Sequence, residues 1–302
     1  MIQIIVFSFD RALQLEALLS SIRRYWTRSA YVLTVVYNTS GEDFERGYVQ
    51  LQQDYPEFCF LKETRSDHRW PKADYFRFFN LKKMLLYPKL RHQYSDFRDL
   101  LVGILRDSKA PYTMFLTDDS VFIREVALAD LDLSYIDEDV SQNQISLRLG
   151  SQVSACPSEI PVQDGCLKWR FHRYPLDSSW GYSFSVDAHI YATSLIRQVL
   201  ERVIFNNPNT LEGNVCHYVR VRKLLDRGLT FEYPYILSFP LNRVQDVADN
   251  KSLGISVSFL NEQYLDGKRL EYPTPELIKE FQQYPSELRL VKDGVTEILS
   301  IQ

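Results

Sequence analysis

The chain is poor in the residues that mark disulfide-stapled, zinc-binding and redox proteins. Its four cysteines lie far apart and include no Cys-x-x-Cys pair, so scattered reduced thiols are the expected state. Four of its five histidines show no metal-ligand spacing, which favours structural or surface roles. These residues are Cys59, Cys156, Cys166, Cys216, His68, His92, His172 and His217.

Excess charge and long apolar runs are also missing. The formal net charge of -4 gives no general attraction to nucleic acid, and we expect no nucleic-acid partner. No apolar run approaches the roughly 18 residues of a membrane-spanning helix. The sequence enters an apolar run directly after Met1, without a basic leader segment, so a soluble cytoplasmic protein is expected.

Apolar residues make up 45% of the chain, and their spacing in the first half alternates between strand and helix patterns. This β-α-β-α-β order predicts an α/β fold with a mainly parallel central sheet flanked by helices. Strands are expected at 2–9, 31–37, 58–61, 112–116, 145–149, 183–191 and 230–237. Helices are expected at 10–25, 44–53 and 95–106, from near 212 to about 227 with Gly228 as its end, and at 275–283.

The most informative motif runs from Tyr112 to Ser120, where an apolar segment stops at two adjacent acids, Asp118 and Asp119. A buried parallel strand of this kind brings its acids to the edge of the sheet where open α/β sheets bind ligands. Adjacent side chains on a strand point to opposite faces, so one acid can hold a ribose or backbone partner and the other a divalent cation. The alternative is a strand end followed by an ordinary Asp-Asp-Ser turn.

The order of these segments resembles the GT-A fold and, within it, the family 2 glycosyltransferases, over residues 1–245. The segment from Phe7 to Ile22 is similar to the family's first strand and helix, and that from Phe115 to Ser120 to its aspartate signature for a nucleotide sugar. The segment from Asn209 to Gly228 resembles a later helix of the family, which an acidic residue opens and a glycine ends.

The resemblance implies an enzyme that moves a sugar from a nucleotide diphosphate sugar to a hydroxyl of a glycan, lipid-linked or polysaccharide acceptor, with inversion. It implies a nucleotide-sugar half at 1–125, an acceptor half at 126–245 and a C-terminal extension at 246–302. A UDP-sugar is the expected donor, and Mn²⁺ or Mg²⁺ the expected cofactor, held by Asp119 and Asp118. The donor-binding candidates are Ser8, Asp10, Arg11, Asn38, Arg98 and Asp118.

Two departures from the family's pattern concern the donor site. Asn38 stands after the second strand, where family members often carry an Asp that holds the base, and its amide can pair with a uracil-like edge. After the last strand, Asn242 and Arg243 stand where many members place a metal-binding His, so a lower metal affinity is expected.

The second half supplies candidates for the acceptor site and the general base. Strand-like alternation places Asp187 and His189 on one face, and Trp169 and Trp180 offer rings for stacking on sugars. Core aromatics and a satisfied Asp-His pair are the structural alternatives. Glu212 is expected near the first turn of its helix, where the dipole favours an ionised carboxylate that can act as the general base, with Asp187 as the next candidate.

A basic and aromatic region from Lys62 to His92 carries nine Lys or Arg residues against three acids. It fits a wall of the diphosphate pocket or a peripheral contact with the inner face of a membrane, although a solvated helical face explains most of these charges.

Two functions other than glycosyl transfer stay open. A nucleotidyltransferase acting on sugar phosphates would usually show a glycine-rich phosphate loop, which the segment Phe9–Ala12 lacks, and a catalytically inactive GT-A module would only bind or scaffold.

Overall fold

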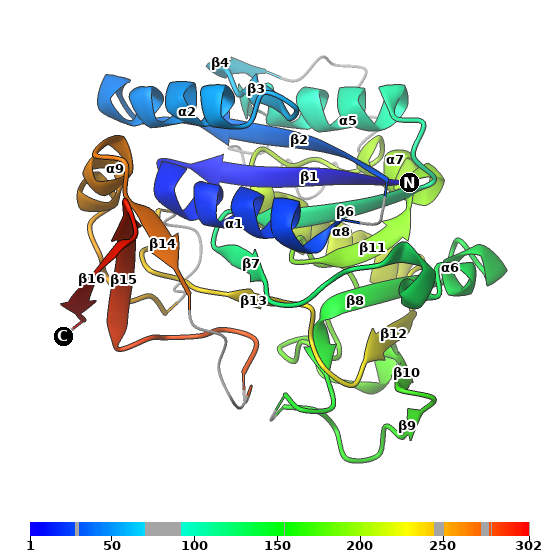
Figure 1. Ribbon diagram of the computed structural model, residues 1–302. Coiled ribbons are helices and arrows are strands. Elements are labelled where there is room, and N and C mark those ends of the chain that lie inside the picture. Colours follow the sequence, from blue (N-terminus) through cyan, green and yellow to red (C-terminus); the bar gives the residue numbers. More distant parts are fainter. Residues whose placement is uncertain are drawn as a thin grey trace.

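The computed structural model describes residues 1–27, 30–69, 92–153, 155–244, 251–272, 278 and 280–301. A nine-stranded sheet in the order β3-β2-β1-β6-β11-β8-β12-β10-β9 runs through the molecule and is flanked by helices (Figure 1). None of the described helices combines the length and the apolar character needed to cross a membrane.

The first half of the sheet is parallel. β1 (Ile2–Phe9) lies between β2 (Tyr31–Asn38) and β6 (Tyr112–Thr117), and β3 (Cys59–Lys62) extends the sheet beyond β2. The helices of this half are α1 (Ala12–Tyr25), α2 (Glu42–Asp54) and α5 (Phe97–Asp107). These elements lie close to their predicted ranges, which confirms the α/β class.

The second half of the sheet is mixed. β11 (His189–Ala192) pairs antiparallel with β6 and with β8 (Asn143–Gly150), whereas β12 (Arg227–Phe231) pairs parallel with β8. β10 (Cys166–Arg170) pairs antiparallel with β12 and with β9 (Val162–Gln163). Among the described strands of this sheet, β10 and β11 run against the others, so the sheet is mainly parallel in direction, as predicted.

The helices form two groups. α1 and α2 pack together and against α9 (Val257–Leu265), whereas α5 packs against α7 (Thr193–Leu200), which also contacts α8 (Pro208–Val221). Shorter elements outside the main sheet are β4 (Arg65–Arg69), β5 (His92–Ser95), β7 (Ser120–Phe122), β13 (Ile236–Ser238), α6 (Ser134–Glu138), and the 3-10 turns η2 (Leu128–Leu131) and η3 (Phe171–Arg173).

The strand predicted at 183–191 is wrong over most of its length. Only β11 is strand, because Ala188 adopts a left-handed backbone with a φ of 56° and turns the chain just before it. Tyr191 OH fixes the irregular part by accepting from Ser185 N and donating to Ser185 O, both at 2.8 Å. Asp187 and His189 therefore do not share a face of one strand.

Three further boundaries differ from the prediction. The strand expected at 230–237 is split into β12 and β13, with Pro234 in the break. α8 ends at Val221, and Gly228 lies inside β12 instead of ending the helix. The described part of the segment 275–283, residues 278 and 280–283, is not helical, and the rest of that segment lies outside the described residues.

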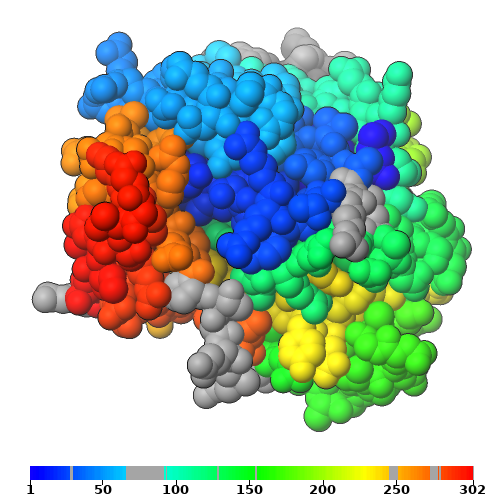
Figure 2. Space-filling view, viewed as in Figure 1, coloured from blue at the N-terminus to red at the C-terminus, as the bar shows by residue number. Residues whose placement is uncertain are grey.

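The C-terminal extension shares the main core. It contains α9, β14 (Arg269–Glu271), β15 (Glu287–Lys292) and β16 (Val295–Ser300), and its orange and red residues lie beside the blue α1 and α2 in Figures 1 and 2. Asn261 Nδ2 donates to Asp43 O at 2.9 Å. A Cβ at Gly47 of α2 would lie 2.5 Å from Asn261 Oδ1 and 2.7 Å from Ala12 Cβ, so only glycine permits this approach. Leu260 is almost fully buried at the contact.

Candidate functional site

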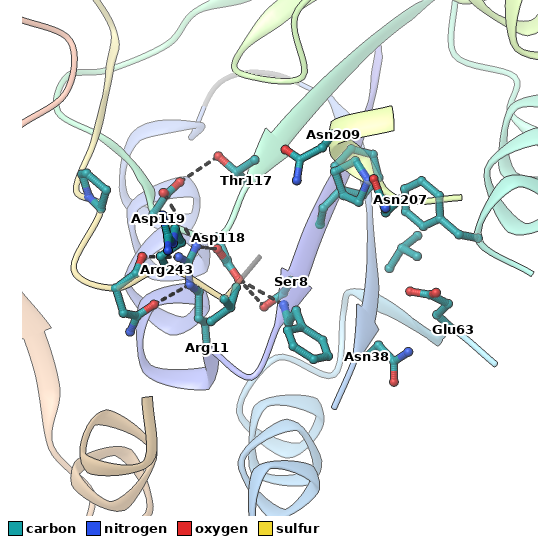
Figure 3. Close-up of a pocket in the computed structure, with 18 of the residues that line it drawn as sticks. Ser8, Arg11, Asn38, Glu63, Thr117, Asp118, Asp119, Asn207, Asn209 and Arg243 are labelled. Atoms are coloured by element: carbon teal, nitrogen blue, oxygen red, sulfur yellow. Dashed lines mark hydrogen bonds and ion pairs between the residues drawn. The ribbon is translucent and has the colours of Figure 1, made fainter. Parts of the chain in front are cut away.

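A cavity of about 700 Å³ opens at the carboxyl ends of β1, β2 and β6 (Figure 3). Parallel strands of α/β sheets bind ligands at this edge. Ser8, Asn38, Thr117, Asp118 and Asp119 all line the cavity, so strand ends that are far apart in the sequence meet there.

Asp118 is fixed by hydrogen bonds from other parts of the protein. Its Oδ2 accepts from Ser8 Oγ at 2.8 Å and from Phe9 N at 3.3 Å, and its Oδ1 accepts from Arg11 Nη1 at 2.9 Å (Figure 3). Burial raises the pKa of the Asp118 carboxyl, and the Arg11 guanidinium opposes this shift. Both of its oxygens already have protein partners, so Asp118 ties the start of α1 to the end of β6.

Arg11 is in turn fixed by Asn242, which follows β13. Arg11 Nε donates to Asn242 Oδ1 at 2.7 Å and Nη2 donates to Asn242 O at 2.5 Å. Asn242 Nδ2 donates to Gln14 Oε1 at 3.1 Å, which sets the orientation of the amide. Asn242 thus holds a cationic side chain next to the acids.

Asp119 is the acid that faces the cavity, with 18% of its side chain exposed. Its Oδ1 accepts from Thr117 Oγ1 at 2.8 Å, and its Oδ2 lies 3.7 Å from Arg11 Nη1. Within the described part of the chain, no group of three or more His, Cys, Asp or Glu side chains is placed to hold a metal ion. A single carboxylate nevertheless suits Mg²⁺ or Mn²⁺ that takes its other ligands from substrate phosphates and water.

Asn38 and Glu63 lie at the far end of the cavity, at the ends of β2 and β3 (Figure 3). Burial raises the pKa of the Glu63 carboxyl, and the Ser95 hydroxyl opposes the shift. Sequence reasoning missed Glu63, although its position two residues after the strand predicted at 58–61 is a signal that could have found it. Asp10 does not line the cavity; it has a φ of 56° and accepts from Ser40 N at 2.8 Å.

Two further acids lie next to the cavity on the other side. Asp187 Oδ1 accepts from Thr117 Oγ1 at 3.0 Å, and Asp187 Oδ2 accepts from Arg148 Nη1 at 2.5 Å. Glu212 Oε1 accepts from Ser185 Oγ at 2.8 Å and from Val186 N at 2.9 Å, so it fixes the turn that carries Asp187.

The electrostatics of this acid pair differ from the expectation for Glu212. Glu212 lies in the second turn of α8, one turn after the cavity residue Asn209, and the N-cap of the helix is Asn207. Burial, followed by the charge of Asp187, raises the pKa of Glu212 to about 7. Burial also raises the pKa of Asp187, and Arg148 opposes that shift. The helix dipole therefore does not decide the ionisation of Glu212.

Arg98 lies away from the cavity lining, which argues against its predicted donor-binding role. Arg98 Nε donates to Val203 O, and Nη2 donates to Leu200 O and Glu201 O, each at 3.0 Å. These carbonyls lie at and just beyond the end of α7, where helices leave acceptors unsatisfied. The side chain joins α5 to α7 and is 8% exposed.

The predicted acceptor aromatics are core residues. Trp180 is fully buried and Trp169 is 6% exposed, in a separate apolar cluster where their ring centroids lie 4.9 Å apart. Trp169 Nε1 donates to Trp180 O at 3.0 Å. Gly228 makes room for this arrangement, because a Cβ there would lie 2.4 Å from the Trp169 ring. His189 is also buried and pairs with Gln144 Oε1 at 2.8 Å, and burial lowers its pKa.

The C-terminal extension contributes a wall of the site that no sequence pattern indicated. Ser238 N donates to Phe281 O at 2.9 Å, and Gln283 N donates to Ser238 O at 2.8 Å. This pairing continues β13, which itself pairs with β7 directly after Asp119. Gln282 lines the cavity, and Arg148 Cζ lies 4.3 Å above the Phe281 ring.

Most of the basic region from 62 to 92 lies outside the described residues, because 70–91 are not described. Of its described members, Arg65 lines the cavity with its Cζ 4.8 Å above the Phe9 ring. Lys62 Nζ instead pairs with Glu45 Oε2 at 2.6 Å.

A curated protein similar to the chain is a glycosyltransferase. No protein-family model matches it. The chain is 22% identical over 290 residues to the bifunctional glycosyltransferase pgtA of Dictyostelium discoideum, a match that covers 82% of this chain and 33% of that protein. The chain thus spans about a third of the length of this curated relative. The match confirms the resemblance to glycosyltransferases that the sequence motifs indicated.

Solved structures similar to the chain match it at low sequence identity. Residues 1–349 of TarS from S. aureus are 14% identical, with a TM-score of 0.44 and coverage of 78% of this chain and 60% of that one. The same TarS fragment in complex with UDP is 15% identical, with a TM-score of 0.45 and coverage of 78% and 59%. The mannosyltransferase PcManGT from Pyrobaculum calidifontis, in complex with GDP-Man and Mn²⁺, is 14% identical, with a TM-score of 0.31 and coverage of 50% and 36%.

Proposed function

We propose that the protein transfers a sugar from a nucleotide diphosphate sugar to a hydroxyl acceptor. The observation that carries the proposal is the cavity at the carboxyl ends of β1, β2 and β6, in which Asp118 is held by the protein and Asp119 faces the open space. The glycosyltransferase named as a curated relative supports the same class of reaction.

The donor fits the cavity with its base near Asn38 and Glu63 and its diphosphate near Asp119 and Arg243. An amide and a carboxyl side by side can serve a uracil edge, which presents both carbonyl oxygens and an N–H, and we keep a UDP-sugar as the proposed donor. Ser8, with Arg11 behind Asp118, completes the floor of this pocket.

Asp119 would hold a divalent cation together with the donor diphosphate. A bound Mg²⁺ or Mn²⁺ would neutralise charge on the leaving nucleoside diphosphate. Arg11 lies close to both acids and adds positive charge at the same end of the cavity.

The proposed reaction is a single displacement with inversion at the anomeric carbon. The acceptor oxygen forms a bond to that carbon as the bond to the phosphate oxygen breaks, and the acceptor proton passes to a general base. Glu212 is the proposed base, since a pKa of about 7 suits proton transfer near neutral pH. Asp187, which lies closer to the cavity through Thr117, is the second candidate.

The proposed acceptor and the proposed location of the protein in the cell rest on the sequence alone. A glycan, lipid-linked or polysaccharide hydroxyl remains the proposed acceptor. A cytoplasmic protein with peripheral contact at the inner membrane face remains the proposed setting, and the basic region that suggested this contact lies largely outside the described residues.

Calorimetry with UDP and with GDP, each with and without Mn²⁺, tests the proposal. The parent protein should bind one nucleotide more tightly with Mn²⁺, and Asp119→Asn should remove that increase. Asp107→Asn, at the exposed end of α5, is the matched control and should bind like the parent. Binding of neither nucleotide would reject the proposed function, and a parental response of Asp119→Asn would reject its metal site.

A panel of nucleotide sugars then identifies the donor by its slow hydrolysis in the absence of an acceptor. Release of the free sugar and the nucleoside diphosphate is expected. Formation of pyrophosphate from a nucleoside triphosphate and a sugar phosphate would instead identify a nucleotidyltransferase.

A further inference from the structure

The hydroxyl of Thr117 lies between two carboxylates from different parts of the chain. Thr117 Oγ1 is 2.8 Å from Asp119 Oδ1 and 3.0 Å from Asp187 Oδ1, with Ser120 Oγ as a third neighbour at 3.3 Å. Thr117 ends β6 and lines the cavity, whereas Asp187 belongs to the irregular turn before β11. The Thr117 side chain therefore contacts both the donor end of the cavity, where Asp119 lies, and the acid pair of Asp187 and Glu212.

A threonine hydroxyl has a single hydrogen, so it can give a full hydrogen bond to only one of two ionised carboxylates at a time. Asp187 has a second partner on its other oxygen, Arg148 Nη1 at 2.5 Å. The other oxygen of Asp119 lies 3.7 Å from Arg11 Nη1, beyond hydrogen-bond distance. The two acids thus compete for one donor, and the acid that receives it is held more firmly.

We propose that Thr117 is a positioning residue that couples occupancy of Asp119 to the placement of Asp187. The inference rests on the proposed function and states how its donor end and its acid pair communicate. If Asp119 held a cation and the donor diphosphate, its carboxylate would be satisfied and the Thr117 hydroxyl would turn to Asp187. Asp187 is then fixed between Thr117 and Arg148, next to Glu212, when donor is present.

Two substitutions separate the hydroxyl from the shape of the side chain. Thr117→Val keeps the branched shape and removes the donor, whereas Thr117→Ser keeps the donor and removes a methyl group. Thr113→Val is the matched control, because Thr113 lies on the same strand and its buried hydroxyl pairs only with Thr193 Oγ1, at 2.8 Å, among the hydrogen bonds of the described residues.

A binding cycle tests the coupling without any transfer reaction. The affinity for UDP with Mn²⁺, or for GDP if that nucleotide is preferred, is measured by calorimetry in the parent, Thr117→Val, Asp187→Asn and the double variant. Asp187→Asn should change the affinity by roughly two- to tenfold in the parent and much less in the Thr117→Val background. Additive effects of the two substitutions would overturn the inference. Thermal unfolding of each variant identifies any that is not folded.

Turnover gives the second readout, with the donor identified by the hydrolysis panel. Thr117→Val should lower kcat by roughly 10- to 100-fold, as expected for loss of a hydrogen bond to a charged group, and should change the KM for the donor by no more than the roughly two- to tenfold of the coupling. Thr117→Ser should restore most of this loss, and Thr113→Val should keep the parental kcat. Failure of serine to restore kcat, or an equal loss in Thr113→Val, would reduce Thr117 to a packing role. Absence of nucleotide binding by the parent would instead reject the proposed function, and this inference with it.

Discussion

The donor end of the cavity and its acid pair are built in different ways. At the donor end, Ser8 and Asn38 lie at the ends of regular parallel strands and Asp118 directly follows one, so the sheet itself brings them together. On the other side, Asp187 lies in an irregular turn whose shape depends on Tyr191 and Glu212. The donor end can therefore be located from strand patterns, whereas the acid pair depends on long-range hydrogen bonds.

The same difference gives the two sides different electrostatics. Asp118 has its positive partner, Arg11, at 2.9 Å and directly follows the end of β6. Glu212 accepts its hydrogen bonds from neutral groups, Ser185 and Val186, and lies beside a second carboxylate. A carboxyl in the second environment can take and release a proton near neutral pH. The comparison predicts that changes on this side act mainly on chemistry and changes at the donor end mainly on binding, with Thr117 as the proposed link between the two.

Glu212→Gln should show the largest effect. Glutamine keeps the shape and can still accept from Ser185 and Val186, but it cannot take a proton. We expect kcat to fall by about 10² to 10⁴ with little change in affinity for the nucleotide. Steady-state transfer rates and calorimetry measure the two quantities. Near-parental transfer would move the base to Asp187, for which Asp187→Asn is the matched variant.

Trp180→Ala tests whether the aromatic pair belongs to the core or to the acceptor site. Trp180 is fully buried, so its loss should destabilise the fold by about 3–5 kcal/mol in chemical denaturation. Nucleotide affinity measured well below the unfolding midpoint should remain parental. Unchanged stability together with a lower transfer rate would restore the acceptor role that the sequence suggested. Trp180→Phe provides a milder change if the alanine variant does not fold.

The pH dependence of transfer should follow Glu212. Its pKa of about 7 means that the ionised, proton-accepting form is lost as the pH falls below that value. The parental kcat/KM should therefore drop by about tenfold for each pH unit below 7 and level off above it. This acidic limb should disappear in Glu212→Gln. A flat parental profile between pH 6 and 8 would contradict the assignment.

The sequence predicted the donor end of the site better than the acid pair. Buried strands with β-branched and aromatic residues, such as Ile2–Phe9 and Tyr112–Thr117, gave correct elements, and the parallel order then placed their ends together. The alternation around Asp187 was misleading, because the left-handed turn at Ala188 has no signal in a non-glycine residue. Gly228 looked like a helix end, although it lies in a strand where only a residue without a Cβ leaves room for the Trp169 ring of the neighbouring strand. Such contacts depend on tertiary packing, which local patterns do not encode.

The smallest expected effect concerns the C-terminal wall. Phe281 lies under Arg148, whose Nη1 holds Asp187, so the extension supports the acid pair through two contacts. Phe281→Leu keeps an apolar side chain but removes the ring face, a loss of about 0.5–1 kcal/mol for a cation–π contact. Because Arg148 would be held less firmly, we expect a roughly two- to fivefold lower kcat with unchanged nucleotide affinity.

The matched control for Phe281→Leu is Phe259→Leu, the same change in α9 of the same extension. Phe259 packs at the edge of the main core and forms no cation–π contact among the described residues, so its substitution should affect stability alone. Equal losses of kcat in the two variants would mean that the extension acts only by stabilising the fold. A loss confined to Phe281→Leu would show that residues outside the predicted catalytic segment 1–245 tune the acid pair. The donor end, whose acids are fixed by β1 and β6, should bind UDP with Mn²⁺ equally well in both variants.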